Sequence, residues 1–352
     1  MSNINFGLTF ALMNLASEAY NAVLTDQEFT LGYRNLDGSW SEYYSRQRWL
    51  DANGFTIIEY PAGSSNHARY WGIVTVQGSR LVVAMRGTDF GSWNDIAVDT
   101  WSCWVGEGGN ISCPFSPWTV TVGGRQQTVW VHRNFLGVYI DIQVNVRDTV
   151  SRLLAQHGSA ITEVYVTGHS LGGALAAICA LDLQLYLPST YTARPRLLTF
   201  GAPFTGNDDF AALLAQQVPT DQRFAAGSDW VPTVPTRGWT PAWMDWCAGG
   251  QHGPEPTPVF ASYAQVGELQ ALTQPAWFPT SHALTSYYGA VMALAPSTVS
   301  SGFKPTDPVT SLVLRIKTAD VLGAGTDVDI SVATLGVDWG VLDKAWYDDF
   351  EQ

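Results

Sequence analysis

The sequence has little positive charge. Of its 352 residues, 18 are Lys or Arg and 31 are Asp or Glu, so the formal net charge is −13. No basic surface is available to release counterions from phosphates, and we therefore exclude nucleic acid as a partner. The acidity also disfavours electrostatic attraction to anionic membranes, so contact with a lipid–water interface would have to be apolar. The 15 Trp residues are suited to such a contact.

Cysteine is scarce as well. The four cysteines show no spacing typical of metal ligands, and we expect neither a metal nor another cofactor. Cys179 is expected to be a small buried residue. Cys103 and Cys113 flank a glycine-rich loop and could either form a disulfide in an oxidising compartment or stay reduced. The cysteines therefore leave the compartment open.

Long hydrophobic runs are missing. Residues 1–20 lack a basic start and contain Asn14, Ser17 and Glu18, which is typical of an amphipathic helix rather than a signal peptide. Residues 283–296 are nearly uncharged, but this run is too short to span a bilayer and is predicted to form a core helix. The localisation and the oligomeric state are not determined by these features.

Apolar residues and alternating strands and helices dominate the rest of the chain. Hydrophobic residues make up 46% and charged residues 14%, which permits one large α/β domain with a smaller attachment. Strands and helices alternate, and this order predicts a mostly parallel central sheet with helices on both faces. Active residues should lie at the carboxyl ends of its strands. The predicted strands are 55–60, 71–76, 81–85, 164–167, 196–200 and 223–226, with a hairpin at 118–132 and a long helix over 135–154.

The segment 161–177 carries the main functional signal. Four β-prone residues lead into Gly168, Ser170 and Gly172, and small helix-forming residues follow. This Gly-x-Ser-x-Gly pattern between a strand and a helix predicts a strained turn with an exposed serine hydroxyl. Ser170 is therefore the candidate nucleophile. Leu171 opens the helix, so its backbone N–H is a candidate donor to an oxyanion.

A serine nucleophile needs a base, and the base needs an acid that fixes its tautomer. Of the histidines after Ser170, His282 precedes an aromatic helix, whereas the alternative His252 lies in a flexible glycine-rich turn. Asp229 follows a strand end and precedes a rigid Trp-Val-Pro exit, so we prefer it to Asp221, which is expected in a loop. We predict a catalytic triad of Ser170, Asp229 and His282. Asp182, Asp208 and Asp209 are expected in helices, and His169 is expected to have a packing role.

The loop after the strand 81–85 supplies two further candidates. Thr88 stands at the strand end and is the predicted second oxyanion donor, the alternative being a simple turn residue. Residues 89–99 have apolar side chains at helical spacing, which fits either a mobile lid or an ordinary surface helix.

These motifs resemble the class 3 lipase family, which includes the fungal triacylglycerol lipases. The matching segments follow the expected order over most of residues 1–300, and they are 86–88, 131–132, 167–176, 199–203, 206–207 and 229–232, with Phe135, Tyr139, His282 and Tyr287. Phe204 and Thr205 depart from the family pattern. The resemblance implies an α/β-hydrolase fold. It also implies Ser170, Asp229 and His282 as the triad, Thr88 and Leu171 as the oxyanion hole, and a lid within 89–99. It favours an extracellular location.

The C-terminal part has a different character. Residues 1–300 are predicted to be the hydrolase domain and 301–310 a Gly- and Pro-containing linker. Residues 311–352 read as strand, turn and strand and resemble the opening of a PLAT/LH2 domain, a β-sandwich associated with lipid binding. The alternative is an acidic hairpin. This segment is too short for a complete sandwich, so it is predicted to be a truncated unit or to pack on the main domain.

The expected function is hydrolysis of carboxylic esters of lipids through an acyl-serine intermediate, as in a triacylglycerol lipase. Soluble or aryl esters, such as feruloyl esters, and phospholipids cleaved in the manner of phospholipase A1 are the alternative substrates. A protein that has kept the fold and only binds lipid is the non-enzymatic alternative. The expected partner is thus a lipid or another ester.

Overall fold

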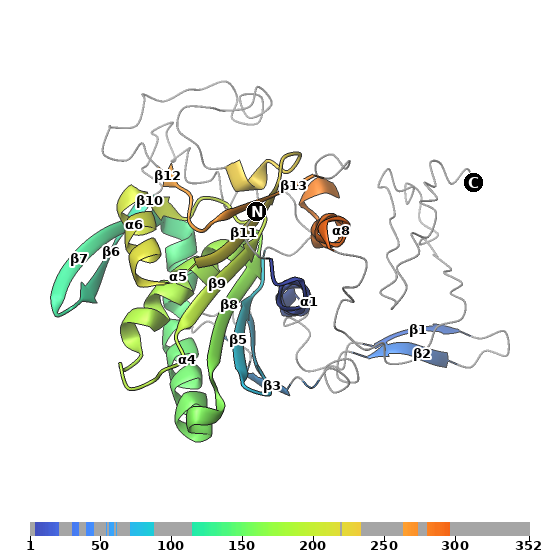
Figure 1. Cartoon of the computed structure of the whole chain (residues 1–352), viewed down its shortest axis with the longest axis horizontal. Coiled ribbons are helices and arrows are strands. Elements are labelled where there is room, and N and C mark those ends of the chain that lie inside the picture. The colour runs from blue at the N-terminus through green and yellow to red at the C-terminus, as the bar shows by residue number, and fades with distance from the viewer. Residues whose placement is uncertain are drawn as a thin grey trace, which may run out of the picture.

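The computed structural model describes residues 4–20, 30–34, 40–45, 54, 56–59, 61, 71–87, 115–218, 220–233, 263–273 and 280–295. Its central element is a seven-stranded sheet with the strand order β13-β11-β9-β8-β5-β4-β3 (Figure 1). The strands are β3 (Thr56–Glu59), β4 (Gly72–Gln77), β5 (Arg80–Met85), β8 (Glu163–His169), β9 (Pro195–Phe200), β11 (Thr220–Ala226) and β13 (Leu269–Leu272).

Most of this sheet is parallel. The pairs β5–β8, β8–β9, β9–β11 and β11–β13 are parallel, while β3–β4 and β4–β5 are antiparallel. This confirms the predicted α/β class with a mostly parallel sheet. Because the parallel strands run in one direction, β8, β9 and β11 end at the same edge, and the segments after them meet there.

Helices cover both faces of the sheet (Figure 1). One face packs against α4 (Arg133–His157), α5 (Leu171–Tyr186) and α6 (Asp208–Gln217), and the other against α1 (Phe6–Tyr20) and α8 (Leu284–Leu294). Side chains of β8 alternate between the two cores: Val164 and Val166 join the α4–α5 side, and Tyr165 joins the α1–α8 side. Burial on both faces explains the continuous apolar run in this strand. Among the described helices, none is long and apolar enough to cross a membrane.

Two smaller sheets accompany the central one. The first has the order β12-β10-β7-β6, and its hairpin of β6 (Phe115–Val122) and β7 (Arg125–His132) confirms the predicted one. Its other strands are β10 (Gly206–Asn207) and β12 (Tyr263–Ala264). The second pairs β1 (Thr30–Arg34) with β2 (Trp40–Ser45), two strands that are not among those predicted from the sequence. Short 3₁₀ helices are η2 (Gly158–Ala160), η3 (Val231–Thr233) and η5 (Thr280–His282).

Candidate active site

Ser170 occupies a strained turn between β8 and α5. Its φ of 58° makes it the only non-glycine with positive φ among the residues that the structure describes. A non-glycine residue in such a conformation costs roughly 1–3 kcal/mol, and the surrounding structure must hold it there. Two backbone hydrogen bonds do so: Ser170 N–H donates to Phe200 O at 3.0 Å, and Gly173 N–H donates to Ser170 O at 2.8 Å.

The glycines beside Ser170 are required by close packing. A Cβ on Gly168 would lie 2.2 Å from Gly172 O, and a Cβ on Gly172 would lie 2.3 Å from Met85 O. Both contacts are with backbone atoms, which cannot move aside cheaply. The two glycines therefore let the first turn of α5 approach β8 and the end of β5, and this close approach fixes the turn that presents Ser170.

The structure brings Ser170, His282 and Asp229 into one hydrogen-bonded line. Ser170 Oγ lies 2.8 Å from His282 Nε2, and His282 Nδ1 lies 2.8 Å from Asp229 Oδ2. All three residues are buried. The carboxylate oxygen can only accept, so His282 carries its proton on Nδ1, and Nε2 is left to accept from the serine hydroxyl. This arrangement can take a proton from Ser170.

Neutral donors complete the surroundings of Asp229. Val231 N–H donates to Oδ1 at 3.0 Å, and Tyr287 Oη donates to Oδ2 at 2.6 Å. The direction of the tyrosine bond is fixed because Ala226 N–H donates to the same hydroxyl at 3.3 Å. Burial raises the pKa of Tyr287 well above its ordinary value, and the nearby Asp229 raises it further, so the hydroxyl keeps its proton. The carboxylate is thus buried with its oxygens satisfied.

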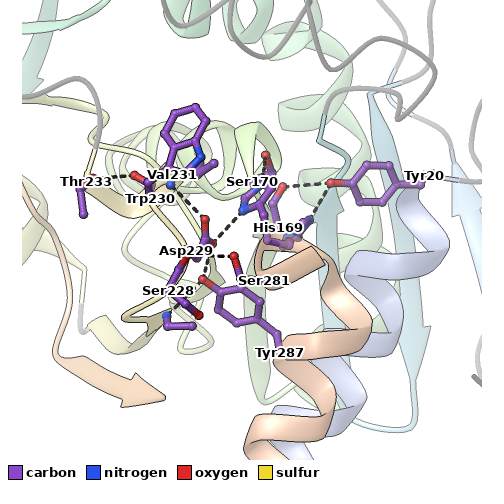
Figure 2. Close-up of polar contacts among 12 residues, drawn as sticks. Tyr20, His169, Ser170, Ser228, Asp229, Trp230, Val231, Thr233, Ser281 and Tyr287 are labelled. Atoms are coloured by element: carbon purple, nitrogen blue, oxygen red, sulfur yellow. Dashed lines mark hydrogen bonds and ion pairs between the residues drawn. The ribbon is translucent and has the colours of Figure 1, made fainter. Parts of the chain in front are cut away.

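His169, expected to serve packing, makes two side-chain hydrogen bonds beside this line. Its Nε2 lies 2.7 Å from His282 O, and its Nδ1 lies 2.8 Å from Tyr20 Oη. Figure 2 shows Tyr20 reaching His169 from α1, while Tyr287 reaches Asp229 from α8. The site therefore draws on both helices of the α1–α8 face. Tyr20 is not predictable as a site residue from the sequence, because no local pattern connects a tyrosine in the first helix with a turn 149 residues later.

The remaining candidates from the sequence lie partly within and partly outside the described residues. Leu171 is the first residue of α5, so its N–H has no acceptor within the helix, as expected. Asp182 points into contacts with α4, and Asp221, expected in a loop, lies within β11 because that strand begins earlier than predicted. No group of three metal-ligating residues occurs among the described residues. The candidates Thr88, the segment 89–99, His252, Cys103 and Cys113 lie outside the described residues.

Cys179 and the aspartates of α6 are placed as the sequence indicated. Cys179 is a buried free thiol. Burial raises its pKa, and the nearby Asp182 raises it further. A thiol held in its neutral form is inert, which agrees with a packing role. Asp208 and Asp209 stand in the first turn of α6, where Asn207 caps the helix by accepting from Phe210 N–H.

The fold with this sheet order and turn is that of an α/β-hydrolase. Residues 82–239 match the family model of class 3 lipases. The matched segment contains Ser170 and Asp229 and ends before His282, so the placement of His282 rests on the geometry described above.

Named relatives share parts of the chain. Phospholipase A(1) DAD1, chloroplastic, from Arabidopsis thaliana is 30% identical over 128 residues, which are 35% of this chain and 28% of the relative. Secreted mono- and diacylglycerol lipase 1 from Fusarium solani is 36% identical over 106 residues, which are 30% and 29% of the two chains. The native propeptide complex of Rhizomucor miehei lipase is 21% identical with a TM-score of 0.47, over 77% of this chain and 69% of that chain. The chain matches less than a third of the length of the two curated relatives.

Proposed function

We propose that this protein hydrolyses carboxylic esters of lipids through an acyl-serine intermediate. The observation that carries the proposal is the continuous line from Ser170 Oγ through His282 to Asp229, with both contacts at 2.8 Å. Such a line is the arrangement that activates a serine hydroxyl, whose own pKa is too high for it to attack unaided. The match of residues 82–239 to the family model of class 3 lipases supports the same reaction class.

In the first half-reaction, Ser170 Oγ attacks the ester carbonyl carbon while His282 Nε2 takes the hydroxyl proton. The C–O bond to the alcohol then breaks, and the alcohol leaves with the proton that His282 returns. Asp229 holds the Nδ1 proton in place and stabilises the imidazolium that forms in between. In the second half, water repeats the attack on the acyl-serine with His282 as base, and the carboxylic acid and free Ser170 are released.

The negative charge that develops on the carbonyl oxygen needs donors. The backbone N–H of Leu171 is one proposed donor, because it sits at the start of α5, where the helix dipole also favours negative charge. Thr88 is the proposed second donor. Loss of one such donor typically lowers kcat by about a hundredfold to a thousandfold.

Lipid esters are the favoured substrate class. The Fusarium solani relative is named as a mono- and diacylglycerol lipase, and the Arabidopsis relative is named as a phospholipase A(1). We therefore propose acylglycerols as substrates, with phospholipids as the second candidate. The predicted lid at 89–99 and the PLAT-like segment at 311–352 would support contact with a lipid–water interface. An extracellular location is proposed because the Fusarium relative is named as secreted, although the Arabidopsis relative is named as chloroplastic.

The test is an ester panel run on the intact chain and on Ser170→Ala. It includes tributyrin below and above its solubility limit, a p-nitrophenyl ester, a feruloyl ester and a phospholipid labelled in its acyl chains. The proposal expects turnover by the intact chain only, with a jump in rate when tributyrin forms an emulsion. Equal rates on dissolved and emulsified ester would contradict the lipid preference.

Covalent labelling separates an enzyme from a lipid-binding protein. A fluorophosphonate should form an adduct on Ser170 in the folded chain, because labelling needs the same activated hydroxyl. The Asp182→Asn variant, altered far from the site, should be labelled equally well. Absence of an adduct on folded protein would reject the hydrolase assignment.

A further inference from the structure

His169 is a buried, titratable side chain that the proposed reaction does not use. It has no exposed surface, and its ring lies 4.7 Å from that of His282 between centroids. A second imidazole so close to the base affects the base in two ways. It can hold the base in place, and it can oppose or permit the positive charge that the base acquires.

The hydrogen-bond partners fix the protonation state of His169. Its Nε2 lies 2.7 Å from the carbonyl oxygen of His282, which can only accept, so Nε2 carries a proton. Its Nδ1 then accepts from Tyr20 Oη at 2.8 Å in the neutral ring. Burial holds the pKa of His169 well below its ordinary value of 6.5, and the neighbouring His282 lowers it further. The ring is therefore a neutral link with one donor and one acceptor.

This link acts on the backbone of His282. The residue ends η5 and precedes α8, whose N-cap residue Ala283 makes no side-chain capping bond. A buried carbonyl without a donor would be costly, so the bond from His169 stabilises this backbone position. The position of the His282 ring depends on the position of its Cα. A shift of the backbone would therefore lengthen the 2.8 Å contact from Nε2 to Ser170 Oγ.

Tyr20 is enclosed at the other end of the link. A Cβ on Gly87 would lie 2.1 Å from Tyr20 Oη and 2.8 Å from His169 O, so the hydroxyl packs directly on the backbone of Gly87. Gly87 follows β5 and immediately precedes Thr88. The tyrosine hydroxyl thus contacts both the turn that carries Ser170 and the strand end that leads to the predicted oxyanion donor.

We propose that Tyr20 and His169 are positioning residues that hold His282 in line with Ser170, through the chain Tyr20 Oη–H to His169 Nδ1 and His169 Nε2–H to His282 O. The neutral state of His169 adds a second effect: no like charge opposes the imidazolium that forms on His282 during the reaction. This inference rests on the proposed function, since it assigns a task within the proposed reaction.

The test compares Tyr20→Phe, His169→Ala and His169→Gln on a water-soluble p-nitrophenyl ester. Tyr20→Phe should lower kcat by about fivefold, the factor that corresponds to one ordinary hydrogen bond, with KM within about twofold. His169→Ala removes the donor to His282 O and should lower kcat by roughly a hundredfold. His169→Gln keeps an N–H donor at similar reach and should recover part of that loss. Tyr139→Phe, which removes a buried hydroxyl between α4 and α5, is the matched control and should leave kcat unchanged.

Nitrogen NMR of the histidines in the wild-type chain provides a readout that does not depend on activity. His169 should show the Nε2–H tautomer, and its pKa should lie well below the ordinary value of 6.5. An Nδ1–H tautomer, or a titration at or above pH 6.5, would overturn the proposal. So would a wild-type kcat in folded Tyr20→Phe, even if its thermal stability fell. If the wild-type chain hydrolyses no ester in the panel, the proposed function fails, while the NMR result still tests the link itself.

Discussion

Two buried aspartates, one between α4 and α5 and one at the carboxyl edge of the sheet, have similar burial and different surroundings. Asp182 and Asp229 are each 2% exposed. Asp182 accepts from Tyr139 Oη and Gln143 Nε2 and forms a two-bonded ion pair with Arg147, whose Nε lies 2.8 Å from Oδ2. Asp229 accepts from a backbone N–H, from a tyrosine hydroxyl and from His282.

The difference lies in the cation. Arg147 is always charged, so the charge of Asp182 is permanently neutralised and the pair can only join two helices. In the proposed reaction, the imidazole of His282 gains a proton only when Ser170 gives one up, so the carboxylate of Asp229 can stabilise a transient cation. A buried carboxylate is therefore structural or reactive according to whether its partner can change its charge.

The largest expected difference between the two aspartates appears when the charge of each carboxylate is removed in turn. Asp229→Asn should lower kcat by about 10⁴-fold, because the amide favours the wrong tautomer of His282, while the fold persists. Asp182→Asn should leave kcat per folded molecule within about twofold. Steady-state kinetics with active-site titration measures both. Similar losses of kcat in the two variants would contradict the distinction between a structural Asp182 and a reactive Asp229.

Removing the cation tests the structural side. Arg147→Met should lower the free energy of unfolding by about 3–5 kcal/mol, since it leaves Asp182 buried without its counter-charge. Urea denaturation followed by tryptophan fluorescence gives this value, and kcat per folded molecule should not change. Arg80→Met breaks the ion pair of Arg80 with Glu163 near the surface and is the control, with an expected loss below about 1 kcal/mol.

Acid should distinguish the two regions, because only the site region holds the buried neutral His169. The pKa of this histidine is lowered in the folded chain, so below pH 6.5 the unfolded chain binds the extra proton and the folded one does not. Stability should therefore be fully present above that pH and fall by up to about 1.4 kcal/mol per pH unit below it. His169→Gln should remove this part of the slope. Denaturation between pH 8 and pH 5 measures it, and parallel curves for the two proteins would disprove the linkage.

The smallest effects come from deleting one hydroxyl at each carboxylate. Tyr287→Phe and Tyr139→Phe both remove a donor to an Oδ2 atom, at 2.6 Å and 2.8 Å. Each should lower stability by about 1–3 kcal/mol, since a buried acceptor loses its partner. Only Tyr287→Phe should also lower kcat, by a few-fold, because Tyr287 contacts the carboxylate that holds His282. Equal kcat values for the two variants would remove the distinction.

Local pattern was sufficient for much of the fold and for the composition of the site. The strand before Ser170, the glycines around it and the small residues after it are adjacent in sequence, so the strand, turn and helix could be predicted directly. Asp229 could be selected because it follows a strand end and precedes a rigid Trp-Val-Pro exit, and His282 because it comes after Ser170 and the acid and precedes an aromatic helix. The strand that contains Asp221 began earlier than expected, since polar residues there obscured the period of the strand.

The amino-acid sequence was enough to predict the candidates for the proposed chemistry: a serine on a glycine-flanked turn, a histidine and an aspartate in a workable order, and a mostly parallel sheet. Which polar groups meet around them depends on the tertiary packing. Tyr20 from α1 and Tyr287 from α8 reach His169 and Asp229 because both helices pack on one face of the sheet. Contacts between residues so far apart in the chain depend on how helices pack on strands, and neither periodicity nor residue type at a single position encodes that packing.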